Sequence, residues 1–153
     1  MEKFFYTFGA TGFLTIIMFP LAVAVKFVVT LWAVFLIWLS SGSILIALPK
    51  WISSELNFII STALIQFISV YYIVSIPLYV VVYIYYKKTD MMNWRIVFFV
   101  PYSIVALAVF LLNDENLFER LWGSSCLLIA ASISYFRFKR SWMPKLTNNV
   151  SQN

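Results

Sequence analysis

The 153-residue sequence has no histidine and a single cysteine, Cys126. Without histidine, the chain lacks the usual general base, the serine–histidine triad and the commonest zinc and haem ligand. One cysteine permits neither an intramolecular disulfide nor a thiolate cluster. The sequence also lacks a glycine-rich phosphate-binding loop and any pair of acids within an apolar stretch. We therefore expect a protein that is not an enzyme and that holds no metal and no cofactor.

Charge is scarce as well. Only 11% of the residues are charged and 63% are hydrophobic, whereas a soluble domain is typically about 25% charged and about 45–50% apolar. So little polar surface cannot cover a water-soluble globule, and the apolar residues come in long runs. The composition predicts an all-α, polytopic membrane helical bundle formed by residues 1–140. Residues 141–153 are polar and are expected to form a disordered cytoplasmic tail.

Four apolar stretches are long enough to cross a bilayer, which takes about 20 residues. They are residues 13–39, 56–88, 94–112 and 117–136. We predict that 56–88 is one helix, kinked near Pro77, because a proline removes a backbone hydrogen bond. The Ser-Ser-Gly-Ser run at 40–43 predicts the first break, and the short apolar stretch 44–51 predicts an interfacial segment.

The first stretch allows two interpretations. It can be one long or bent helix, since a membrane helix tolerates Pro20 where neighbouring groups satisfy the freed carbonyl. Alternatively, two crossings meet in a tight turn at Lys26. We favour one helix, because residues 24–28 offer no Gly, Pro, Asn or Asp for a turn. A five-crossing arrangement remains open, since it leaves every later loop on the same side.

The basic residues predict the orientation. They gather beside the ends of apolar stretches rather than on a polar face, so we expect no nucleic-acid partner. Two groups lie two crossings apart: Lys87, Lys88 and Arg95, and then Arg137, Lys139 and Arg140. Because basic residues are retained in the cytoplasm, we expect a multi-pass protein of a bacterial inner membrane with both termini cytoplasmic. The acidic turn 113–116 then lies outside.

Two polar residues fall inside the apolar stretches. An ionisable group such as Lys26 is costly inside a membrane and is a functional candidate by default, although its side chain can instead reach the inner headgroups. Gln66 needs a polar partner, either as a contact between helices or in a transport path.

Small and acidic residues supply the remaining candidates. Gly123, Ala130 and Ser134 permit close helix packing in the last stretch, and Ala130 and Ser134 are spaced four apart. Asp114, Glu115 and Glu119 form an acidic group that is either a solvated loop or a docking point for a basic partner outside.

These features favour a small non-enzymatic membrane protein that acts through helix–helix contacts with a membrane partner. That partner is another membrane protein or a second copy of the chain. In size and topology the chain resembles the immunity proteins of pore-forming bacteriocins, and the resemblance implies a protector that binds another membrane protein within the lipid. An accessory subunit fits equally well. The alternative is a small oligomeric transporter or channel in which Lys26 and Gln66 line a shared path.

Overall fold

The computed structural model describes residues 1–41, 55–85, 92–114 and 116–142, and all regular structure within them is helical. The elements are α1 (Glu2–Ser41), α2 (Glu55–Ser69), the π-helical segment η2 (Val70–Val74), α3 (Ile76–Ile84), α4 (Trp94–Leu112) and α5 (Leu117–Ser141). They supply four helices long and apolar enough to cross a membrane, with α2, η2 and α3 together forming the second. The predicted interfacial segment 44–51 lies outside the described residues.

Helix α1 is a single helix of 40 residues that continues through Pro20 and Lys26. The prediction of one long helix is therefore confirmed, and a turn at Lys26 is excluded. The helix ends at Ser41, within the predicted break, but it begins eleven residues earlier than residue 13. At 1.5 Å per residue α1 is about 60 Å long, twice the roughly 30 Å thickness of a hydrocarbon core.

The second membrane-length helix is irregular well before Pro77. It is π-helical from Val70 to Val74, turns at Ser75 and resumes as α3. Pro77 has no N–H to give to the carbonyl of Ile73, and its ring crowds that carbonyl. A π-helical turn inserts one extra residue and relieves this crowding. The predicted kink is therefore present, and it lies upstream of the proline rather than at it.

Helices α4 and α5 pack closely against each other, and α4 also packs against α1. Helix α4 spans 94–112 as predicted, and α5 extends five residues beyond the predicted 136. The backbone N–H of Asn93 donates to Thr7 Oγ1 at 3.1 Å, and Lys26 Nζ donates to Asn113 Oδ1 at 3.1 Å. Residues 7–26 of α1 therefore run in the same direction as α4, which is about 28 Å long.

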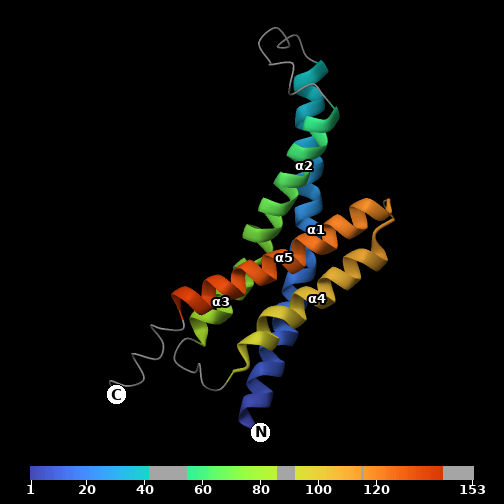
Figure 1. Cartoon of the computed structure of the whole chain (residues 1–153). Helices are drawn as coiled ribbons and strands as arrows, with labels where there is room; N and C mark the ends of the chain where they lie inside the picture. Colours follow the sequence, from blue (N-terminus) through green and yellow to red (C-terminus); the bar gives the residue numbers. More distant parts are fainter. Residues whose placement is uncertain (42–54, 86–91, 115, 143–153) are drawn as a thin grey trace.

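Both described termini lie at one end of the molecule (Figure 1). There the ring of Tyr6 meets that of Tyr85, with centroids 6.1 Å apart. Aromatic residues also join α4 to α5 at this end: the centroid of the Phe138 ring lies 4.9 Å from that of Trp94 and 5.1 Å from that of Phe98, with the rings tilted. This cluster fixes the start of α4 against the end of α5.

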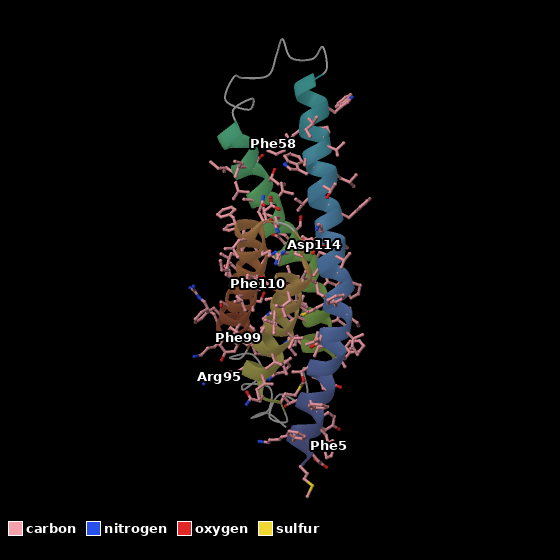
Figure 2. All side chains as sticks on the ribbon, turned by 90° about the vertical axis from the view of Figure 1, so that its right-hand side faces the viewer. Phe5, Phe58, Arg95, Phe99, Phe110 and Asp114 are labelled. Carbon is pink, nitrogen blue, oxygen red and sulfur yellow. The ribbon has the colours of Figure 1, made fainter. Side chains whose placement is uncertain are left out.

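At the opposite end α1 and α2 continue past the turn between α4 and α5. Figure 2 shows Phe58 of α2 well beyond Asp114 along the long axis. We call residues 27–38 of α1 and 58–64 of α2 the apolar arm. No residue of the arm is buried. Its exposed large apolar residues include Phe27, Leu31, Val34, Phe35, Ile37, Trp38, Ile59, Ile60 and Leu64.

Candidate functional site: a polar cavity beside the α4–α5 turn

A cavity of about 520 Å³ lies where the apolar arm joins the rest of the bundle. Four helices line it, and most of the wall is apolar. Its polar lining residues are Lys26, Thr30, Thr62, Gln66, Asn113 and Glu119. Three of these were singled out from the sequence, and a fourth sequence candidate, Gly123, also lines the cavity. The fold thus gathers candidates that lie up to 97 positions apart in the chain.

Lys26 stands at the level of the α4–α5 turn. Its side chain is exposed, and its ammonium group donates to the side-chain oxygen of Asn113. The hydroxyl of Thr30 donates to the Lys26 carbonyl at 2.9 Å, one turn further along α1. Lys26 therefore lies beside the C-terminal end of α4, and Thr7 lies beside its N-terminal end.

Gln66 meets α5 at Gly123. A Cβ atom added to Gly123 would lie 3.4 Å from Gln66 Nε2 and 3.6 Å from Val109 Cγ1. The missing side chain therefore leaves room for the Gln66 amide between α2 and α5. Close approach of helices at a small residue is the usual arrangement in membrane bundles.

The predicted acidic residues Asp114 and Glu119 are both exposed but differ in what they line. Glu119 lines the cavity, whereas Asp114 is exposed at the turn and does not line it. Glu115 lies outside the described residues. Glu119 is one helical turn before Trp122 and Gly123, which are on the same face of α5 and also line the cavity.

Two buried polar atoms in the cavity wall have no hydrogen-bond partner among the described residues: Thr62 Oγ1 and Trp122 Nε1. A buried donor without an acceptor is costly, so such atoms call for an explanation. Trp122 and Asn113 were not identified from the sequence. The available signal was a spacing of four between polar or small residues on three helices, in the pairs Lys26 and Thr30, Thr62 and Gln66, and Glu119 and Gly123.

Ala130 and Ser134 lie elsewhere, on the part of α5 that faces the kink. Both are fully buried within the chain. Beside them the hydroxyls of Ser75 and Tyr102 form a buried hydrogen bond of 2.7 Å, which ties the kink to α4. Ser134 Oγ is buried without a hydrogen-bond partner among the described residues. These two small residues therefore pack against helices of the same chain and are not available to a partner.

The polar groups of the cavity are side chains that can form hydrogen bonds. Among the described residues no three His, Cys, Asp or Glu side chains are close enough to hold a metal ion. The cavity offers one ammonium group, two side-chain amides, one carboxylate and hydroxyls, which can hydrogen-bond a small polar group. No protein-family model, curated protein or solved structure matches the chain.

Proposed function

We propose that the chain is a non-enzymatic integral membrane protein that acts through helix–helix contacts with another membrane protein. One observation carries the proposal. In the most apolar 18-residue stretch of α1 only 6% of the residues are buried within the chain, compared with 33–39% in the other three membrane-length helices. Helix α1 is therefore held by its own chain along one narrow stripe and offers the rest of its surface to other molecules.

The apolar arm is the surface proposed for the partner. The part of α1 beside α4 is about 28 Å long, which is close to the thickness of the hydrocarbon core. The arm adds about 18 Å at 1.5 Å per residue, so one 30 Å layer does not cover both. An apolar patch of this kind outside lipid marks an interaction site. Its exposed aromatic residues, Phe27, Phe35 and Trp38, suit a partner that carries apolar helices to the same height.

The orientation is part of the proposal. We propose a bacterial inner membrane with both termini cytoplasmic and the α4–α5 turn outside. It is supported by basic residues near the end where the termini lie: Lys3, Arg95, Arg137, Lys139 and Arg140. Alkaline phosphatase, which is active only outside the cytoplasm, should be active when fused after Asn116 and inactive when fused after Thr89. The reverse pattern would contradict this orientation.

Site-specific photo-cross-linking tests the proposed contact. A photoreactive residue at Phe35, in the arm, should give an adduct with a second polypeptide in native membranes. The same residue at Leu107, which is exposed on α4, is the matched control and should give none. Expression of both variants is compared by blot. An adduct of twice the chain's mass would indicate that the partner is a second copy. Adducts with lipid alone at both positions would refute the proposal.

A transporter or channel subunit is the second candidate, favoured by the polar cavity that Lys26, Gln66 and Glu119 share. If the cavity is part of a transport path, proteoliposomes should show solute flux that Lys26→Met abolishes. Lys3→Met, which removes a lysine far from the cavity, is the control. Absence of flux with the natural sequence would count against this candidate.

A further inference from the structure

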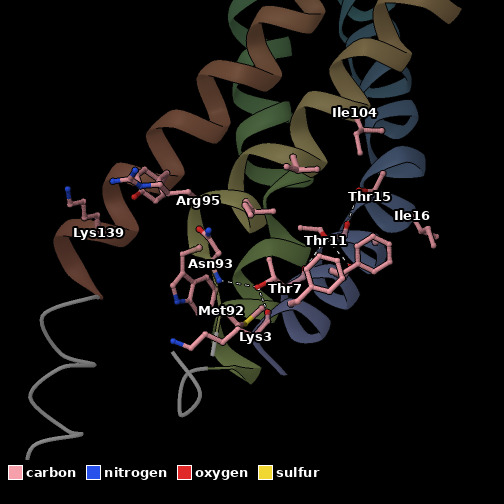
Figure 3. A pocket seen from close by; sticks show the side chains of 17 residues that line it. Lys3, Thr7, Thr11, Thr15, Ile16, Met92, Asn93, Arg95, Ile104 and Lys139 are labelled. Atoms are coloured by element: carbon pink, nitrogen blue, oxygen red, sulfur yellow. Dashed lines mark hydrogen bonds between the residues drawn. The ribbon is translucent and has the colours of Figure 1, made fainter. Parts of the chain in front are cut away.

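A second and larger hollow lies at the other end of the chain. It is an open groove of about 1050 Å³ between the first half of α1 and the first half of α4. Figure 3 shows the residues that line it. The walls are mainly apolar, with Phe4, Phe8, Ile16, Val100 and Ile104 among the lining residues.

The threonines in this groove do not make it polar. Thr7, Thr11 and Thr15 each donate their hydroxyl to a backbone carbonyl of α1 four residues earlier, at 2.8 Å. These hydroxyls already donate to the helix backbone. A hydrocarbon chain in the groove would therefore leave none of them without an acceptor. Gly12 lines the groove too, and a Cβ added there would meet nothing within 4 Å.

The mouth of the groove is cationic. Three basic side chains from three different helices line it: Lys3 of α1, Arg95 of α4 and Lys139 of α5 (Figure 3). None forms an ion pair with a carboxylate among the described residues. The first turn of α4 lies at the same mouth, and Asn93 does not cap it with its side chain. The backbone N–H groups in the first turn of α4 therefore add positive potential at this mouth.

The groove has the length of one leaflet. From Arg95 to Ile104 it follows α4 for about 14 Å, and from Lys3 to Ile16 it follows α1 for about 20 Å. Half of a 30 Å hydrocarbon core is about 15 Å. Trp94, which is 5% exposed and lines the groove, holds its indole N–H buried without an acceptor among the described residues. The Trp94 indole can therefore donate a hydrogen bond to a polar group of a ligand in the groove.

We propose that this groove binds one anionic phospholipid. The phosphate lies among Lys3, Arg95 and Lys139, and an acyl chain lies along α1 and α4. Charge complementarity favours an anionic headgroup over a zwitterionic one, since basic pockets between membrane helices at the cytoplasmic surface select anionic lipids. The dimensions and the apolar walls favour a lipid over a soluble phosphate compound.

Native mass spectrometry of the full chain in mild detergent tests the proposal. Phosphatidylglycerol and phosphatidylcholine with identical acyl chains are added at equal concentration. The natural sequence should retain phosphatidylglycerol several-fold more than phosphatidylcholine. Equal retention of the two lipids would overturn the proposal, as would displacement of phosphatidylglycerol by excess glycerol phosphate, which would identify a site for a soluble phosphate.

Two matched pairs of variants locate the site. Gly12→Leu fills the groove and should abolish the preference, whereas Gly9→Leu, on a glycine of the same helix with equally open surroundings that does not line the groove, should keep it. Lys139→Gln should weaken phosphatidylglycerol binding about fivefold, while Arg140→Gln should leave it unchanged. Circular dichroism checks folding, and the pair at Lys139 and Arg140 decides the outcome if Gly12→Leu does not fold. If the two variants of each pair retained phosphatidylglycerol equally, the lipid would bind elsewhere and the proposed site would be refuted.

Discussion

Helix α1 has two halves that are similarly apolar and differ sharply in burial. In the half beside α4, the buried residues form a stripe in which successive turns are three, four or seven positions apart: Thr7, Ala10, Thr11, Leu14, Met18 and Val25. In the half that belongs to the apolar arm, the same stripe continues only as half-buried residues, such as Val29, Ala33 and Leu36. Hydropathy alone therefore does not decide which half packs. The presence of α4, η2 and α3 beside the first half does.

The largest difference between the halves should appear when an aromatic side chain is removed. Phe98→Ala empties a fully buried position in the packed part. It should destabilise the chain near the lower end of the roughly 3–5 kcal/mol typical of such changes, because lipid offers little hydrophobic driving force. Phe27→Ala, in the arm, should change stability by less than about 0.5 kcal/mol. Unfolding in mixed detergent micelles, followed by circular dichroism, measures both. Equal losses would show that the arm is packed.

A smaller effect is expected at the kink. Tyr102→Phe removes the buried 2.7 Å hydrogen bond to Ser75. The expected cost is about 0.6–2 kcal/mol, the range for polar contacts between membrane helices. Tyr83→Phe removes an exposed hydroxyl and serves as the control. The same unfolding measurement applies, and an unchanged Tyr102→Phe variant would mean that the hydroxyl pair does not hold the kink.

Substitution of Gly9 and Gly123 by alanine compares an open position on α1 with a closely packed position on α5. Gly9→Ala should stabilise α1 by up to about 1 kcal/mol, because alanine is the better helix former and nothing is near. Gly123→Ala should gain less, since its Cβ would meet the Gln66 amide at 3.4 Å. Thermal unfolding in mild detergent compares the two variants. A larger gain at Gly123 would contradict the tight approach of α2 and α5.

The smallest effect is expected at the boundary between the halves. Lys26→Met removes the exposed hydrogen bond to Asn113 and should cost under about 1 kcal/mol. A double-mutant cycle with Asn113→Ala isolates the pair. A coupling well above 1 kcal/mol would show that this contact, and not the packed stripe, aligns α1 with α4.

Much of the fold is predictable because membrane crossing depends on length and hydropathy. The bounds of α4 and the end of α1 follow from the polar residues beside them. The start of α1 at Glu2 was not predicted; in this part of the helix the hydroxyls of Thr7 and Thr11 bond the helix backbone itself. The π-helical segment was also missed, because the position of a kink depends on contacts such as the one between Ser75 and Tyr102.

The site is less predictable than the fold. Lys26 and Gln66 are visible as polar residues in apolar stretches, but their neighbours depend on helix register. Lys26 meets a residue 87 positions away because α1 and α4 are parallel. Each helix is apolar on nearly all sides, so the sequence marks no face as the packed one. For the same reason Ala130 and Ser134 could be recognised as packing residues without showing that their partners lie in the same chain.

The threonine hydroxyls of α1 also bear on how the protein is made. All four threonines of this helix donate to its own backbone, at 2.8–2.9 Å. Asn93, which donates to Thr7, follows it by 86 positions. Helix α1 precedes α4 in the chain, so these hydroxyls have acceptors before α4 is synthesised. The hydroxyls of α1 therefore need no hydrogen-bond acceptor from the later helices, and α1 is a self-sufficient helix on which those helices can pack.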